Sequence, residues 1–402
     1  MPGGSPALSN QLGGEGTVIA WRNGLLAAYL ASGLLISALV SRLPAMRDAL
    51  QLDHANVGLL LLCLSAGSFL SVALSGQAVL RLGATSVMRI AASLAGCSLL
   101  LIGISASVFE STWLTGIFLF TQGLGTASWN VASNVQGAAM ERALGRSIMP
   151  ALHGFFSIGT VLGAGVGALA AAVNLPLFVH YAVMGVIIVV TVLVSARSFG
   201  EDFSRTPRNH TGPSLAQAWK EPQTILLGVL VLGMALAEGA AGDWVALALA
   251  DGYQTSEATG AIGYGVFVST MTLTRLLSGD LILRLGRVIM IRASAIAALI
   301  GVLLFAFAGN LPLAFIGLAI WGMGVALTFP LAMSAASQDP LRAATRVSVV
   351  STIGYGAFLG GPPLLGLLAG AIGLLPALGS ISILVVLAFF LSSNVADHRS
   401  EK

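Results

Sequence analysis

Four ionisable residues lie inside long apolar stretches of the chain: His153, Glu238, Asp243 and Arg275. A charge at membrane depth costs about 2.5–3.5 kcal/mol on insertion scales, so each needs a partner, water or a task. The chemistry open to them is the binding and release of a proton and the binding of a charged solute group. The alternative is a permanent pair that holds helices together.

Glu238 is the main candidate for proton transfer. It lies about 15 residues into an apolar segment, which at about 1.5 Å per residue places it near the middle of a bilayer. Burial favours its neutral form and a nearby cation favours its charged form, so its proton affinity can follow a conformational cycle. Asp243 lies about 140° around the same helix, which predicts a separate role.

Asp243 and His153 complete the predicted proton-coupling set. Asp243 lies toward the outer end of its segment, as Arg42 does, and a pair between them is predicted to latch an outer gate. The alternative is that Arg42 reaches the outer interface alone. His153 can titrate near neutral pH, or it can be a hydrogen-bonded packing residue.

Arg275 has an apolar counterpart, Val72, in an earlier stretch that resembles its own surroundings. This asymmetry predicts a specific task, either binding an anionic solute group or neutralising Glu238. The alternative is a structural bond to Asp280 or to carbonyls at a helix end.

Asn130, Asn134, Gly137 and Glu141 recur at helical spacing and form one polar stripe. Amides donate and accept hydrogen bonds, which suits hydroxyl-rich solutes. Bonding between helices is the alternative use of the same groups.

The elements that carry these residues are predicted to be membrane helices. The chain has 56% hydrophobic and 9% charged residues and a mean hydropathy of +0.92, too little polar surface for a soluble protein. Apolar runs of about 20 residues predict an all-α integral membrane fold of twelve spans. These are 18–42, 54–79, 86–107, 112–139, 148–172, 176–197, 223–250, 257–281, 288–308, 311–336, 343–370 and 372–393.

A repeated hairpin divides the chain into two related halves. Gly76-Gln-Ala-Val-Leu-Arg-Leu-Gly83 returns as Gly279-Asp-Leu-Ile-Leu-Arg-Leu-Gly286, about half the chain later. Internal duplication is typical of transporters that work by alternating access. The predicted parts are a tail (1–17), a six-helix bundle (18–197), a cytoplasmic linker (198–222), a second six-helix bundle (223–393) and a tail (394–402).

Charge placement predicts the orientation. With the N-terminus inside, all of the 19 Lys and Arg residues except Arg42, Arg47 and Arg275 fall in cytoplasmic segments. Both termini are therefore predicted to be cytoplasmic, in a bacterial inner membrane. The net charge of +3 is explained by these loops and does not indicate nucleic-acid binding.

The sequence gives no sign of an enzyme, a metal site or a cofactor. Cys63 and Cys97 both lie in apolar segments and build neither a disulfide framework nor a metal motif. Metalloprotease, hydrolase and P-loop signatures are absent, so any accumulation of solute must use an ion gradient.

The two hairpins resemble the loop signature G-x-L-x-D-R-x-G-R of the major facilitator superfamily, at Gly76, Arg81 and Gly83 and again at Gly279, Arg284, Gly286 and Arg287. The signature's Asp is replaced by Leu80 and Leu283, which leaves Asp280 as the nearby carboxylate. Further stretches resemble a branch with rhizopine-transport-like proteins, distantly similar to fucose permeases. They include Trp129-Asn-Val-Ala-Ser-Asn134, His153-Gly-Phe-Phe-Ser157 and Glu238-Gly-Ala-Ala-Gly-Asp-Trp244.

This resemblance implies a cavity lined by the first, fourth, seventh and tenth spans. The predicted wall residues are Tyr29, Asn130, Asn134, Glu238, Trp321 and Thr328, with Tyr264 and Tyr355 from spans eight and eleven. The residues assigned to gating are Arg42, Arg81, Glu141, Arg142, Arg275, Asp280 and Arg284. Single aromatic residues in this set also fit simple packing.

Together these features predict a monomeric secondary transporter that moves a sugar, inositol or amino-sugar-like solute with protons, by symport. The alternative is a drug or metabolite/proton antiporter of the same fold. The glycine-rich, proline-containing antiporter signature expected in span five is absent there, since Gly159 to Gly167 contains no proline.

Overall fold

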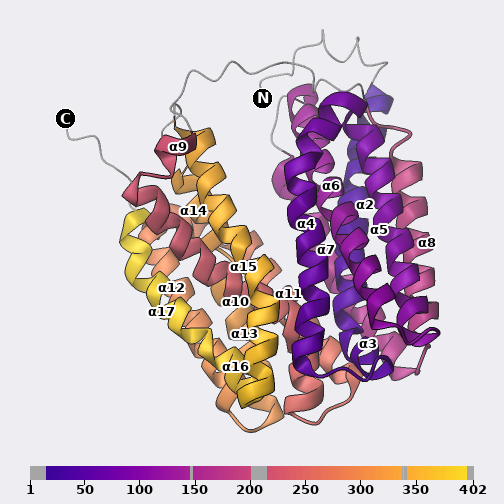
Figure 1. The fold of residues 1–402 in the computed structure, drawn as a ribbon. Helices are drawn as coiled ribbons and strands as arrows, with labels where there is room; N and C mark the ends of the chain where they lie inside the picture. Colours follow the sequence, from indigo (N-terminus) through magenta and orange to yellow (C-terminus); the bar gives the residue numbers. More distant parts are fainter. Residues whose placement is uncertain (1–14, 145–147, 201–214, 337, 339–341, 396–402) are drawn as a thin grey trace. The chain divides into compact units, whose positions relative to one another are not determined.

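The computed structural model describes residues 15–144, 148–200, 215–336, 338 and 342–395, and these residues contain helices and no strand. They divide into two compact units, one of residues 1–52 and 60–207 and one of residues 53–59 and 208–402. The predicted domain boundaries stay predictions. Figure 1 labels the helices within each unit.

The first six predicted spans correspond to six long helices and one short one. A short helix, α3, follows the first span, and the first six residues of α4 belong to the second unit. The helices are α2 (Glu15–Ser41), α3 (Leu43–Ala49), α4 (His54–Leu82), α5 (Ala84–Ser107), α6 (Thr112–Leu144), α7 (Met149–Ala172) and α8 (Leu177–Ser195).

The last six predicted spans correspond to more pieces, because two of the spans are interrupted. The elements are α9 (Leu215–Ala218), α10 (Pro222–Gly252), α11 (Glu257–Leu277), α12 (Gly279–Phe307), α13 (Leu311–Val325), α14 (Thr328–Ala336), α15 (Ala343–Ile372), α16 (Leu374–Ser380), α17 (Ser382–Leu391) and the 3-10 turn η1 (Ser392–Val395). Predicted spans 311–336 and 372–393 are each recovered as one candidate membrane span, Leu311–Ala336 and Leu374–Val395, and each contains a short break between helices.

Ten helices in the described part of the chain are long and apolar enough to cross a membrane. Predicted spans four and eight, now α6 and α11, are not among these ten. Both carry polar residues within their helices, which lowers their mean hydropathy. The helices taken together are consistent with the predicted fold of twelve membrane helices.

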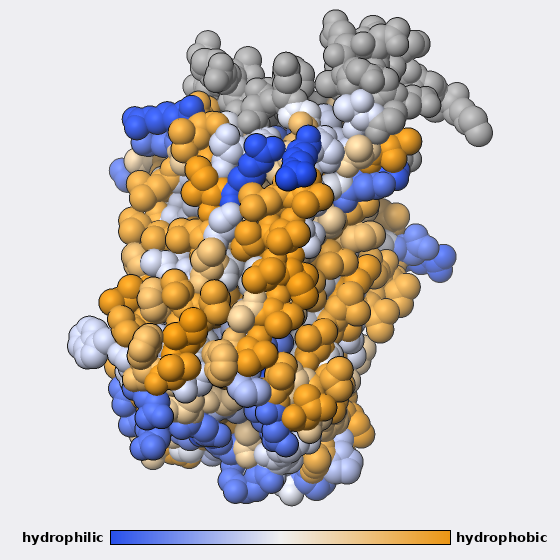
Figure 2. All heavy atoms as spheres, turned by 90° about the vertical axis from the view of Figure 1, so that its right-hand side faces the viewer, coloured by the Kyte–Doolittle hydropathy of each residue, from blue (hydrophilic) through white to orange (hydrophobic). Residues whose placement is uncertain are grey.

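The apolar exterior explains the composition. Figure 2 shows hydrophobic side chains over the middle of the face that bears α8, with hydrophilic ones gathered toward its two ends. The exposed side chains of α8 include Val183, Val186, Ile187, Val190 and Val194. Such a surface suits lipid tails and not water.

Corresponding helices pack in the same pairs in both units. In the first unit α2 packs along α7 and α5 along α6, and in the second α10 packs along α15 and α12 along α13 (Figure 1). The α2–α7 contact is close because Gly33 and Gly159 have no side chain; a Cβ at Gly159 would overlap the carbonyl oxygen of Leu30.

The repeated hairpins share their turn geometry. Gly83 and Gly286 both have positive φ, 84° and 77°, a conformation that favours glycine. Arg89 and Arg292 follow these glycines at the same spacing, and each binds the end of its unit's last helix. Arg89 Nη2 donates to the carbonyl oxygen of Ala196 at 2.6 Å, and Arg292 Nε donates to Ser392 Oγ at 3.0 Å. The two units therefore share both the hairpin geometry and the arginine contact to the last helix.

Candidate functional site

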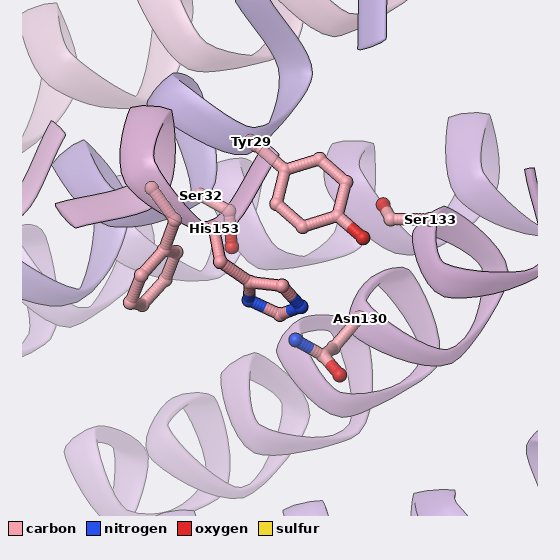
Figure 3. Close-up of a pocket in the computed structure, with 6 residues that line it drawn as sticks. Tyr29, Ser32, Asn130, Ser133 and His153 are labelled. Atoms are coloured by element: carbon pink, nitrogen blue, oxygen red, sulfur yellow. The ribbon is translucent and has the colours of Figure 1, made fainter. Parts of the chain in front are cut away.

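A polar cavity lies among α2, α6 and α7 of the first unit. Its volume is about 50 Å³. Three of its six lining residues, one from each helix, were predicted from the sequence. The lining residues are Tyr29, Ser32, Asn130, Ser133, His153 and Phe156 (Figure 3).

A directed chain of hydrogen bonds leads from the buried Tyr29 to the cavity. The Tyr29 hydroxyl donates to Asn134 Oδ1 at 2.9 Å, and Asn134 Nδ2 donates to Asn130 Oδ1 at 3.0 Å. Bonding between helices, the alternative weighed from the sequence, therefore does occur. Asn130 ends the chain, is exposed, and makes no other bond among the described residues, so its two N–H donors stay available.

His153 orients the tyrosine at the start of this chain. The two rings lie edge to face, with centroids 5.4 Å apart and planes at 77°. Figure 3 shows the amide nitrogen of Asn130 on the side of the histidine ring. His153 thus contributes a titratable ring to the cavity wall as well as a packing contact.

The cavity is small for a solute in this conformation. A water molecule takes about 30 Å³ of the liquid, and ligand pockets usually measure about 300–1,000 Å³. A sugar-sized solute must therefore displace side chains or meet further surfaces. Ser32, Ser133 and Phe156 were missed from the sequence, although each serine lies three residues after a predicted wall residue, on the same helical face.

In the second unit, the predicted residues Glu238 and Arg275 form an ion pair. Arg275 Nη2 on α11 lies 3.0 Å from Glu238 Oε1 on α10, and both side chains are partly exposed, at 32% and 25%. Arg275 Nε also donates to the carbonyl oxygen of Ala326 at 2.9 Å. Arg275 therefore binds two of the partners considered from the sequence at the same time, the acid Glu238 and a helix-end carbonyl. Within the described residues, Arg275 has no bond to Asp280, which is exposed.

The carbonyl that Arg275 uses is available because of a proline. Ala326 lies at the break between α13 and α14, and the residue four positions later is Pro330. Proline has no N–H to complete the helical bond to that carbonyl. The break therefore supplies an acceptor, and the guanidinium connects it to the carboxylate.

The remaining predicted wall residues lie in different surroundings. Trp321 is fully buried and packs against Phe267 and Phe305, with ring centroids 5.8 and 5.9 Å away. Thr328 and Tyr264 are buried as well. In contrast, Tyr355 is 45% exposed, between the rings of Phe329 and Phe358. Trp321 serves packing in this structure.

Two predicted gating residues bind backbone groups within the first unit. Arg42 is buried and its Nη2 donates to the carbonyl oxygen of Leu175 at 3.0 Å. Glu141 Oε1 accepts the backbone N–H groups of Ile148 and Met149, at 2.8 and 3.0 Å, at the start of α7. A carboxylate stabilises a helix start in this position.

Three further gating candidates are Arg81, Arg142 and Arg284. Arg81 and Arg284 are exposed in the two hairpins, and the side chain of Arg142 lies outside the described residues. Asp243 is half-buried on α10, and no hydrogen bond or ion pair of its carboxylate is found among the described residues. The Arg42–Asp243 latch stays a prediction. The described part of the chain also holds no group of three or more His, Cys, Asp or Glu residues suited to a metal ion.

The architecture, two compact helical units with long apolar helices and an apolar exterior, defines a multi-pass membrane protein. The family description "Major Facilitator Superfamily" matches residues 24–362, and the chain belongs to that family.

Similar proteins agree with this assignment. The chain is 32% identical to an uncharacterized transporter, y4wD, of Sinorhizobium fredii, over 87% of this chain and 91% of the relative. It is 28% identical to the membrane protein MosC of Rhizobium meliloti, over 92% and 89% of the two chains. The predicted resemblance to the rhizopine-transport-like branch is confirmed.

Solved structures share the fold at low identity. A nucleoside transporter, NupG, matches with a TM-score of 0.78 at 13% identity, covering 93% of this chain and 99% of its own. The Escherichia coli fucose:proton symporter FucP matches with a TM-score of 0.64 at 16% identity, covering 95% and 100%. Its family membership and its curated relatives make the chain a membrane transporter for a small molecule.

Proposed function

We propose that this transporter carries a small polyhydroxylated solute, such as a sugar, an inositol or an amino sugar, by proton-coupled symport. The observation that carries the proposal is the hydrogen-bond chain from Tyr29 through Asn134 to Asn130. It ends in uncharged donors at a cavity that also holds two serine hydroxyls. Uncharged donors and acceptors match hydroxyl groups without the desolvation cost of a charge.

Proton coupling is assigned to Glu238. Its carboxylate is stabilised by Arg275 when ionised, and protonation removes the charge that holds the guanidinium. Arg275 then keeps only the Ala326 carbonyl, so one proton changes how α10, α11 and the α13–α14 break are connected. Binding of a proton would therefore change the contacts between helices in the second unit.

Two of the similar solved structures are of a nucleoside transporter and a fucose:proton symporter, whose solutes are polyhydroxylated. At 13% and 16% identity these likenesses concern the fold alone, but they define a sensible test panel. We further propose that the protein is monomeric and lies in a bacterial inner membrane with both termini cytoplasmic, in keeping with the distribution of Lys and Arg.

The test is a thermal-shift screen of the purified protein against sugars, inositols, amino sugars, nucleosides and cationic drugs. Any ligand found is then used for uptake into proteoliposomes after a pH jump. Stabilisation by a polyol, with uptake driven by an inward proton gradient, is the expected result. Stabilisation by apolar cations alone, with transport opposed to proton flow, would make the protein an antiporter and overturn the symport proposal.

A further inference from the structure

A second polar cavity, separate from the solute site, lies where α9, α10 and α15 meet in the second unit. Its volume is about 390 Å³, and its lining residues are Gln217, Lys220, Glu221 and Arg342. α9 packs on α15, and the cavity lies beside the starts of α10 and α15, at the end of their membrane spans.

Among the described residues that line the cavity, two are basic and one is acidic. Glu221 Oε1 lies 3.0 Å from Arg342 Nη1, and Glu221 Oε2 lies 2.6 Å from Arg346 Nε. One carboxylate therefore serves two guanidinium groups. Lys220 is exposed and has no partner among the described residues. Among the described residues of this cluster, Lys220, Arg342 and Arg346 are three cations near one carboxylate.

Glu221 keeps its charge and so keeps the arginines in place. Partial burial alone raises the pKa of Glu221. Hydrogen bonds from Arg346 and Thr224 and the charges of Arg346 and Arg342 outweigh this effect, so the pKa lies below its ordinary value. Arg342 remains 47% exposed while bound to Glu221, so part of its guanidinium still faces the solvent.

Two exposed apolar side chains lie close to Lys220 in the sequence. Trp219 is 43% exposed and Leu215 is 48% exposed, both at α9. An exposed tryptophan beside basic residues, at the end of membrane spans, is typical of the level of lipid headgroups. A purely aqueous anion would gain nothing from these two side chains, whereas a lipid would contact them with its acyl chains.

We propose that this cavity binds a phosphate group through Lys220 and Arg342, and that the phosphate belongs to the headgroup of an anionic lipid. Guanidinium and ammonium groups both bind phosphate oxygens well, and the starts of two helices add a favourable field. The site shares no residue with the solute cavity, so its test is independent of the proposed function.

The test uses the full-length protein in detergent, with its melting temperature measured during titration with phosphatidylglycerol, phosphatidylcholine or inorganic phosphate. Lys220→Gln is the main variant because it removes a cation without breaking the Glu221 pairs. Arg197→Gln is the matched control, since Arg197 is exposed in the other unit and also loses one positive charge.

Phosphatidylglycerol should stabilise the wild type, and Lys220→Gln should weaken this apparent affinity about fivefold, as expected for one charge near a lipid surface. Arg197→Gln should leave it unchanged, and phosphatidylcholine should have little effect. If inorganic phosphate alone reproduces the Lys220-dependent shift, the phosphate site is retained and its assignment to a lipid is overturned. Equal responses of Lys220→Gln and wild type to all three ligands would overturn the site itself.

Discussion

The two units share a scaffold but differ in their chemistry. The first unit presents an uncharged chain, Tyr29 to Asn134 to Asn130, whereas the second presents an ion pair, Glu238 with Arg275. The positive-φ glycines and the arginines that bind the last helices are repeated in both. Duplication therefore preserved what builds a bundle, and the polar interiors diverged. We interpret the difference as a division between solute binding and proton coupling.

The largest expected effect tests the coupling role of the second unit. A potential of 100 mV acting on one proton is worth about 2.3 kcal/mol, or about a 50-fold solute gradient. Glu238→Gln should reduce the accumulation ratio in proteoliposomes from that order to about one, while exchange of labelled for unlabelled solute continues. Glu110→Gln, an exposed acid in the α5–α6 turn, is the matched control. Continued accumulation by Glu238→Gln would transfer the proton role to another acid, with Asp243 tested first.

A second prediction concerns the stability of the ion pair. Arg275→Gln should lower the melting temperature because it leaves the Glu238 carboxylate without its cation. Breaking a fully buried pair costs about 3–5 kcal/mol, and we expect about 1–3 kcal/mol here because both side chains are partly exposed. The double variant with Glu238→Gln should be more stable than Arg275→Gln alone. If the two losses simply add, the residues are not coupled and the distinction between the units weakens.

The sequence was sufficient for much of this architecture. The hairpin glycines could be predicted because a repeated Gly at a turn indicates a backbone that other residues resist, and Gly83 and Gly286 do have positive φ. Glu238 could be recognised as significant because a charge in an apolar segment needs a reason. The breaks within predicted spans ten and twelve were missed, since hydropathy does not register an interruption of one or two residues.

The partners of the polar groups could not be determined from the sequence. The Arg275–Glu238 bond depends on how α11 packs on α10, and the sequence left Asp280 as an equal candidate. The role of the Ala326 carbonyl was in principle readable, because Pro330 removes the N–H that would have bonded to it. The choice of Arg275 as the replacement donor required the tertiary structure.

This interrupted helix is the subject of the third prediction. Pro330→Ala returns an N–H that can bond to the Ala326 carbonyl and compete with Arg275. Pro330 would lie in the interior of a continuous helix over α13 and α14, where proline costs about 3 kcal/mol, so we expect amide hydrogen exchange across residues 326–332 to slow by about tenfold or more in the variant. Pro312→Ala is the control, because Pro312 lies in the first turn of α13, where no helical bond is lost. Unchanged exchange in Pro330→Ala would mean that another constraint holds the break open.

The fourth prediction tests the uncharged site of the first unit. Tyr29→Phe keeps the ring that packs on His153 but removes the hydroxyl that fixes the Asn134 amide. One hydrogen bond contributes about 0.5–1.5 kcal/mol, so solute affinity in the thermal-shift assay should fall about two- to tenfold. Tyr181→Phe is the control, since its hydroxyl binds the Leu39 carbonyl away from the cavity. Equal affinity losses in both variants would show a general effect of packing and not of the chain.

The smallest expected effect concerns the pH dependence of stability at Glu221, a charge cluster of the second unit outside its membrane spans. The pKa of Glu221 is held below its ordinary value of about 4.5, because the bonds and charges of its arginine and threonine partners outweigh the effect of burial. A lowered carboxyl pKa contributes stability above the unfolded-state pKa, and this contribution is lost as the pH falls through the folded-state pKa. Glu221→Gln should therefore lower stability at pH 7 by about 0.2–1 kcal/mol, as for an ion pair near the protein surface. The difference from wild type in melting temperature should shrink below about pH 4.5, and a difference that grew toward acid pH would contradict the assigned direction of the shift.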